Sequence, residues 1–295
     1  MRKLTLAIIA LGAPCLAVAG EPKDLPKGPL GDAVRSGYDM IVNTQTNAKV
    51  KPFVGNALNC ASCHRDGGTS DTPGNLLTTA TKFPSYAARE DTVLTLEDRI
   101  DNCFMRSMNG TRPSPDSEVT VDMAAYIAWL ARGKPIYGVQ NSASQPAQAA
   151  KPAVTSDFTV MLKSANHANY ARGSALYAAQ CAACHGADGQ GVPGTFPPLW
   201  GNASYNAGAG LANVVKLATW VKGNMPLGNA HLSAQDAFDV ALFADAQPRP
   251  DFVLAQHLPQ GMKADDYNAK VRAETDTVES NLKKVGLSLE KLRQE

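Results

Sequence analysis

Apolar side chains recur at helical spacing in several stretches of the chain, and segments rich in Gly and Pro separate these stretches. In residues 32–46 the apolar positions follow one another at i, i+4, i+7 and i+8, which places them on one face of a helix. Residues 119–132, 170–179 and 233–246 show stripes of the same kind. The pattern predicts an all-α protein built from amphipathic helices.

Both halves of the chain show the same order of features. Each has a helical stripe, a pentapeptide with two cysteines and a histidine, a loop rich in Gly and Pro, and two further helical stretches. This internal repeat predicts two domains in tandem, residues 20–139 and residues 157–252. Residues 140–156 between them consist mainly of Ser, Gln, Ala and Pro, with almost nothing to bury, which is typical of a linker.

Residues 253–295 form a tail that has no counterpart in the repeat. Its second part, residues 264–295, is dense in charge and has apolar side chains at helical spacing, namely Val271, Val278, Leu282, Val285, Leu289 and Leu292. Such a seam predicts helical structure. We expect this helical tail to pack on the rest of the chain; the alternative is a docking helix for a partner.

The repeated pentapeptide is Cys60-Ala61-Ser62-Cys63-His64 in the first half and Cys181-Ala182-Ala183-Cys184-His185 in the second. Cys-x-x-Cys-His is the attachment sequence of a c-type haem, in which the thiols bond to the haem and the histidine ligates its iron. A single copy could be a zinc or redox pair followed by a chance histidine. Two copies predict two covalently bound haem c groups, with His64 and His185 as iron ligands.

Residues 1–19 have the pattern of a secretory signal peptide: two basic residues, an apolar run and an Ala-x-Ala sequence ending at Ala19. The run is shorter than the roughly 20 residues of a membrane-spanning helix. We therefore expect cleavage after Ala19, a periplasmic protein and no membrane span after cleavage. With 28 basic and 27 acidic side chains, the chain lacks the basic excess that nucleic-acid binding favours.

The residue on the far side of each iron decides between an electron carrier and an enzyme. For the second haem the candidate is Met225, which precedes Pro226 downstream of His185. A methionine ligand raises the potential of a haem. The rival ligand is Lys222, whose amine would first have to lose its proton and its water shell.

For the first haem a nearly equal spacing from His64 leads to Cys103, although Met105 and Met108 are close enough in sequence to compete. Cys103 has no partner cysteine left in the mature chain, and a thiol without a role is a liability in an oxidising compartment. On a helix capped by Thr95 and Asp98, Arg99, Cys103 and Arg106 would share one face. Two cations there would favour the thiolate, so we expect Cys103 to ligate the iron.

The stretch of residues 99–110, Arg-Ile-Asp-Asn-Cys-Phe-Met-Arg-Ser-Met-Asn-Gly, lies between the two haem sites and resembles the dihaem thiosulfate dehydrogenases. Residues 247–252, Gln-Pro-Arg-Pro-Asp-Phe, are similar to that family as well. The resemblance covers residues 31–252 and leaves out the tail.

The resemblance implies that two thiosulfates are coupled to tetrathionate with release of two electrons, and that some relatives run efficiently in reverse as tetrathionate reductases. By motif, His64 and Cys103 would ligate the active-site haem, and Arg89 and Arg99 would hold the anionic substrate. His185 and Met225 would ligate the electron-transfer haem. Some relatives have a lysine directly before this methionine and exchange ligands on reduction; the residue here is Asn224, which puts that exchange in doubt.

A low-potential, cysteine-ligated haem beside a higher-potential one would direct electrons from the Cys103 site to the Met225 site and on to a periplasmic cytochrome or similar redox protein. Our hypothesis is that Cys103 leaves the iron transiently and bonds to thiosulfate sulfur, with Arg89, Arg99 and Arg106 offsetting the repulsion between dianions. The alternatives are a non-enzymatic dihaem electron carrier, a dihaem peroxidase and a subunit of a larger sulfur-oxidising complex.

Overall fold

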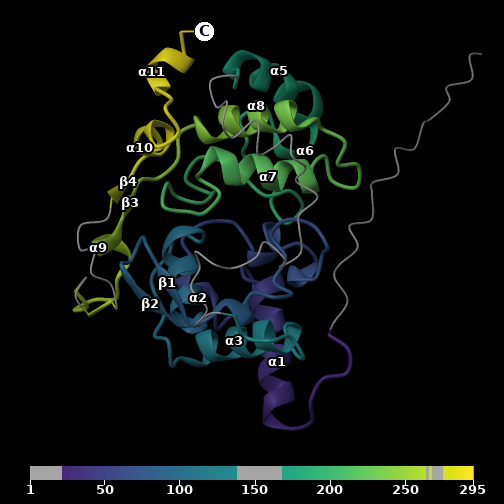
Figure 1. Cartoon of the computed structure of the whole chain (residues 1–295), viewed down its shortest axis with the longest axis vertical. Coiled ribbons are helices and arrows are strands. Elements are labelled where there is room, and N and C mark those ends of the chain that lie inside the picture. Colours follow the sequence, from purple (N-terminus) through teal and green to yellow (C-terminus); the bar gives the residue numbers. More distant parts are fainter. Residues whose placement is uncertain (1–21, 138–167, 264–265, 268–274, 295) are drawn as a thin grey trace, which may run out of the picture.

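Two helical bodies, one from each half of the chain, lie one above the other in the computed structural model, and a C-terminal segment runs along one side of both (Figure 1). The structure describes residues 22–137, 168–263, 266–267 and 275–294. The expected signal peptide (1–19) and the expected linker (140–156) lie outside the described residues.

The first body is built from α1, α2 and α3. Helix α1 (Pro29–Val42) packs against α3 (Glu118–Leu130), and α2 (Leu96–Arg106) lies beside α3. The predicted first and closing helices of this half therefore exist, with ends shifted by a few residues. Between α1 and α2 the chain forms the hairpin of β1 (Ser85–Ala87) and β2 (Thr92–Leu94) and the short 3-10 turns Lys51–Phe53, Cys60–Ser62, Asp66–Gly68 and Ala80–Lys82.

The second body repeats this arrangement. Helix α5 (Tyr170–Gln180) and α7 (Val214–Asn224) both pack on α8 (Ala234–Asp245), and the single turn α6 (Ala182–His185) carries the haem-attachment sequence. These helices agree with the predicted stripes. The chain is mainly helical, as expected, but two short two-stranded ribbons, β1–β2 and β3–β4, were not predicted.

The packing of the first helix on the closing helix is the same in both halves, and in each half it depends on one glycine. A Cβ on Gly37 of α1 would lie 2.0 Å from the carbonyl oxygen of Asp122 on α3. A Cβ on Gly173 of α5 would lie 2.1 Å from the carbonyl oxygen of Asp239 on α8. In both halves the first helix can touch the backbone of the closing helix only because a glycine stands at the crossing.

The two bodies share a core rather than merely touching. The apolar cluster of the first body includes Tyr205, Ala209 and Ala212 from the loop that precedes α7. The same loop bonds to the first half through its backbone, because Ala57 N donates to Ala203 O at 2.9 Å. The interface therefore fixes the second haem-attachment site relative to the first.

The tail packs on its own chain, as expected, but it is not one continuous helix. Strand β3 (Phe252–Val253) pairs with β4 (Thr275–Asp276), and the single turn α9 (Leu254–His257) follows β3. Helices α10 (Val278–Lys283) and α11 (Leu289–Leu292) insert Leu282 and Leu292 into the core of the second body. The chain turns between them at Gly286, whose φ is 77°, a left-handed conformation that ends a helix.

No helix in the described part of the chain is long and apolar enough to cross a membrane.

Candidate functional site

The first haem-attachment sequence lies in a tight turn held by polar contacts. Cys60 opens the turn, and its backbone N–H donates to the Thr44 hydroxyl at 3.0 Å. His64 N donates to Cys60 O at 2.9 Å, which closes the pentapeptide as one helical turn. The turn places the two thiols and the imidazole of one haem site on a short, well-defined stretch of backbone.

The ring of His64 is oriented by a carbonyl of the following loop. His64 Nδ1 donates to Gly74 O at 2.6 Å, so Nε2 remains available to bind iron. Burial lowers the pKa of His64, and the Arg99 guanidinium lowers it further against the opposing effect of the Gly74 contact. Both the orientation and the neutral imidazole suit a haem ligand.

Cys103 lies on α2, close to both cysteines of the first pentapeptide. Burial raises the pKa of Cys60 to about 11 and that of Cys63 to about 12, and the Cys103 thiol contributes to both shifts. Arg99 lies one helical turn earlier and donates from a terminal guanidinium nitrogen to Cys103 Sγ at 3.1 Å. The structure thus brings together the thiol, the arginine and the haem-attachment turn that the sequence predicted to cooperate.

The rival methionines are both buried among apolar side chains. Met105 is 0% exposed and belongs to an apolar cluster with Phe252 and with Tyr267 of the tail. Met108 is 3% exposed and belongs to the core of the first body. Neither carries a charged partner comparable to the Arg99–Cys103 contact.

Arg89 occupies the turn of the β1–β2 hairpin and reaches the second body. One of its guanidinium nitrogens donates to Gly208 O at 2.8 Å. Its side chain is exposed, as is that of Arg99. Both arginines can therefore meet a solute from solvent, which fits their predicted role toward an anion.

Arg106 has a different environment from the one the helical spacing suggested. Its side chain is 4% exposed and its guanidinium pairs with Glu90 at 3.2 Å. The same guanidinium lies 4.8 Å from the ring centroid of Phe252. Because Glu90 and Phe252 hold it inside the protein, Arg106 stabilises the position of α2 rather than presenting its charge to a substrate.

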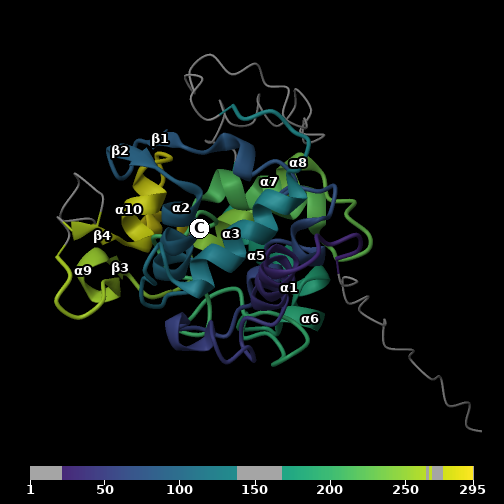
Figure 2. The same cartoon turned by 90° about the horizontal axis from the view of Figure 1, so that it is seen from below.

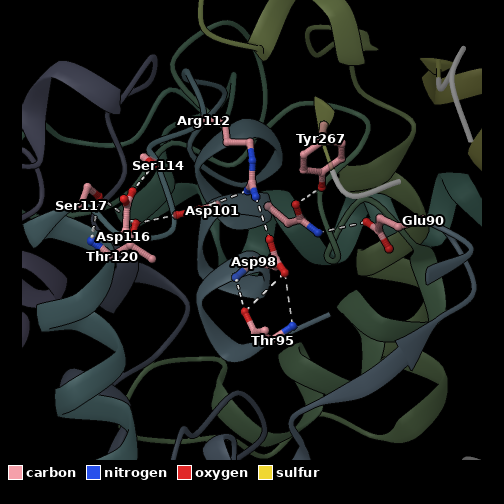
Figure 3. A network of polar contacts seen from close by, with 11 residues as sticks. Glu90, Thr95, Asp98, Asp101, Arg112, Ser114, Asp116, Ser117, Thr120 and Tyr267 are labelled. Carbon is pink, nitrogen blue, oxygen red and sulfur yellow. Dashed lines mark hydrogen bonds and ion pairs between the residues drawn. The ribbon is translucent and has the colours of Figure 1, made fainter. Parts of the chain in front are cut away.

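A network of polar contacts surrounds α2 (Figure 3). The predicted cap is present, with Asp98 N donating to the Thr95 hydroxyl at 3.1 Å. Arg112 pairs with Asp98 at 2.8 Å and with Asp101 at 3.2 Å, and all three are buried. Such a charged network has few alternative arrangements, so it fixes the rotation of α2 and with it the direction of Cys103.

The tail contributes to the same network. The Tyr267 hydroxyl donates to the side-chain oxygen of Asn102, and Asn102 in turn donates to Glu90 at 3.1 Å (Figure 3). Asn102 directly precedes Cys103. The tail, which has no counterpart in the repeat, therefore bonds to the residue next to the candidate ligand.

The second haem-attachment sequence lies on α6 within an aromatic cluster. His185 Nδ1 donates to Pro197 O at 2.9 Å, which again leaves Nε2 available, and burial lowers the pKa of His185. The Tyr177 hydroxyl donates to Gly186 O at 2.7 Å, and the Tyr177 ring lies 5.0 Å from that of Trp200. The aromatic side chains of this cluster provide apolar surface beside the second haem-attachment sequence.

Met225 follows the last residue of α7 directly. Its backbone N–H donates to Val221 O at 2.8 Å, and its side chain packs on the core of the second body. Asn224 beside it is 1% exposed, and its amide donates to Pro73 O at 3.0 Å and to Trp220 O at 2.9 Å. The Asn224 side chain is thus fully engaged between the two bodies.

Sequence reasoning missed the part that Trp220 plays at the first site. Trp220 lies on α7 of the second body, and its indole N–H donates to Cys63 O at 3.0 Å. No local pattern links the two residues, because they lie in different halves of the chain. His257 is 7% exposed, and its Nδ1 donates to Gly110 O at 2.7 Å.

The residues present fit two haems of the c type. All five cysteines in the described part of the chain are free thiols, and four of them form the two attachment pairs. Arg249 is buried and pairs with Asp245 at 3.3 Å, but its Nε and one terminal nitrogen have no hydrogen-bond partner among the described residues. Buried donors of this kind suit the propionate carboxylates of a haem.

Comparison with known families agrees with this architecture. Residues 52–136 match the SoxA/TsdA cytochrome c domain family. Residues 168–243 match the cytochrome c oxidase, cbb3-type, subunit III family. The protein is a dihaem cytochrome c with two cytochrome domains in tandem, each holding one covalently bound haem.

The similar proteins identify the family. The thiosulfate dehydrogenase of Allochromatium vinosum is 38% identical over 254 residues, which cover 83% of this chain and 86% of that protein. That of Stutzerimonas stutzeri is 36% identical over 235 residues, covering 78% and 72%. The chain belongs to the thiosulfate dehydrogenase family and is an oxidoreductase.

A solved structure shows the same fold. The thiosulfate dehydrogenase (TsdBA) from Marichromatium purpuratum superposes with a TM-score of 0.65 at 36% sequence identity. The match covers 79% of this chain and 49% of that one, so this chain spans about half of the solved chain.

Proposed function

We propose that this enzyme couples two thiosulfates to tetrathionate in the periplasm and passes the two electrons through its haems to a redox partner. The observation that carries the proposal is the 3.1 Å contact between Arg99 and Cys103 Sγ beside the attachment turn of Cys60 and Cys63. A thiolate with an adjacent cation can bind iron and can also form a bond to sulfur.

The proposed reaction balances in two steps at Cys103. In the first, the Cys103 thiolate and the terminal sulfur of one thiosulfate lose two electrons and form a sulfur–sulfur bond. In the second, the terminal sulfur of another thiosulfate attacks the sulfur that Cys103 holds, releasing tetrathionate and restoring the thiolate. The haems, when bound, accept the two electrons of the first step one at a time.

The arginines have a defined task in this reaction. Thiosulfate is a dianion, and two dianions must meet at one sulfur atom, so their repulsion has to be offset. Arg99 lies at Cys103, and Arg89 is held in the hairpin turn by its bond to Gly208 O. Their permanent charges lower the energy of bringing the anions together.

His185 and Met225 are the proposed iron ligands of the second haem, from which electrons leave to a periplasmic cytochrome or similar acceptor. Since a methionine ligand raises the potential and a thiolate ligand lowers it, this pair favours electron flow away from Cys103. Tetrathionate reduction is the same sequence of bonds in reverse. The Asn224 amide donates to Pro73 O and Trp220 O, so this side chain is bonded to the protein. It therefore does not take the place of the lysine that exchanges with the methionine ligand in some relatives.

The test is thiosulfate-dependent reduction of ferricyanide by the wild type and by Cys103→Ala. We expect turnover to fall at least about 100-fold in the variant, because the sulfur nucleophile is lost. Haem content is measured in both proteins, so that a loss of haem is not mistaken for a loss of chemistry. Full turnover by a variant with both haems overturns the role of Cys103, and peroxide-dependent turnover without thiosulfate activity would favour a peroxidase.

A further inference from the structure

One face of α7 lies against the first body. Trp220 on this face donates to Cys63 O at 3.0 Å, and a Cβ on Gly223 would lie 2.4 Å from Pro73 Cδ. Lys216, Trp220 and Gly223 are spaced i, i+4 and i+7, so they form one stripe along the helix. Lys216 therefore lies one turn before Trp220 on the side of α7 that meets the first body.

The surroundings of Lys216 are cationic. The Arg89 turn of the hairpin bonds to Gly208 O, in the loop that leads into α7. The pKa of Lys216 is lowered first by desolvation and then by the Arg89 and Arg99 guanidiniums. Arg99 of α2, Arg89 of the hairpin and Lys216 of α7 are thus near enough for their charges to repel, although they come from both halves of the chain.

Of these three cations, Lys216 is the one whose charge is not offset by a neighbour in the described part of the chain. Its ammonium makes no hydrogen bond and no ion pair with the described residues, and its side chain is exposed to solvent. Lys216 also lies in the first turn of α7, where the helix dipole disfavours a cation and favours an anion. A small anion among these three charges would relieve both unfavourable effects.

We propose that Lys216 is a substrate-binding residue supplied by the second domain, which holds a thiosulfate dianion together with Arg89 and Arg99. The binding site is then shared between the two domains. The inference rests on the proposed thiosulfate chemistry and extends it, since a second dianion needs a second source of positive charge. If the site is shared in this way, the close packing of the two domains serves substrate binding as well as electron transfer.

Lys216→Met tests this role, with Lys216→Arg as the conservative variant. Lys134→Met is the matched control, because it removes the same charge from an exposed side chain at the end of the first body's closing helix. We expect Lys216→Met to raise KM for thiosulfate about tenfold or more while kcat changes less than about twofold. Lys216→Arg should keep KM near the wild-type value, and Lys134→Met should leave it unchanged.

The outcomes separate this inference from the proposed function. Wild-type turnover of thiosulfate with equal KM in Lys216→Met and Lys134→Met overturns the role of Lys216 and leaves the function intact. A fall in kcat with unchanged KM also overturns it, because it indicates a disturbed helix rather than a lost anion contact. Absence of thiosulfate turnover in the wild type overturns both. Haem content and the melting temperature of each variant show that the fold is retained.

Discussion

The chemistry of the first site depends on one cysteine and on the charges that surround it. The spacing of Arg99 and Cys103 on a helix predicted their contact, and the structure confirms it at 3.1 Å. The same spacing suggested that Arg106 would share this face, but Arg106 pairs with Glu90 inside the protein. Helical periodicity fixes which side chains share a face, whereas the partner on another element decides which of them remains available.

Arg99→Gln should lower kcat/KM for thiosulfate about 10- to 100-fold, because a charged hydrogen bond to the sulfur and one positive charge at the substrate are both lost. Steady-state reduction of ferricyanide measures the effect. Arg35→Gln removes an exposed arginine that pairs with Asp32 on α1 and should leave kcat/KM unchanged. Equal activity of the two variants would contradict a role for Arg99 at the site.

At the scale of the element, α2 positions Cys103 and is held from both of its flanks. The predicted cap by Thr95 and Asp98 is confirmed, and Arg112 joins Asp98 to Asp101 within the body (Figure 3). The other support comes from Tyr267 of the tail, which no pattern in the sequence places beside α2. Figure 2 shows β3, β4 and α9 together on one side of the molecule, and Leu254 and Leu258 of this segment share an apolar cluster with Met105 of α2.

Tyr267→Phe should lower the free energy of unfolding by about 1–3 kcal/mol, since the buried oxygen of Asn102 loses its donor. Chemical denaturation followed by circular dichroism measures the change. Tyr86→Phe is the matched control, because Tyr86 is 56% exposed and its hydroxyl bonds to Asp91 on the surface. An exposed bond of this kind is expected to contribute less than about 0.5 kcal/mol. Equal stability of the two variants would show that the tail does not support α2.

At the scale of the molecule, the two cytochrome domains are joined by side chains that link the two haem sites. Asn224 accepts from the Thr72 hydroxyl at 2.7 Å and from Arg65 at 3.4 Å, and it donates to Pro73 O. All three partners lie in or next to the loop that follows His64, while Asn224 itself precedes Met225. The interface therefore connects the surroundings of one proposed iron site directly to those of the other.

Asn224→Ala should lower the free energy of unfolding by about 1–3 kcal/mol, because buried donors and acceptors on both domains lose their partner. It should also slow electron exchange between the haems, since the interface that fixes their separation is loosened. Stopped-flow reduction resolves the two haems by their spectra. Asn229→Ala changes an exposed amide just past Met225 and should alter neither quantity. An unchanged exchange rate in Asn224→Ala would show that the interface does not depend on this side chain.

The sequence by itself determined the elements and the chemistry that local spacing encodes. The Cys-x-x-Cys-His repeats, the helical stripes, the cap of α2 and the Arg99–Cys103 pair all depend on residues within a few turns of one another. Tertiary structure alone decided which distant groups meet: Glu90 with Arg106, Tyr267 with Asn102, and Trp220 with Cys63. These contacts join residues far apart in the chain, and a single sequence holds no periodicity that records them.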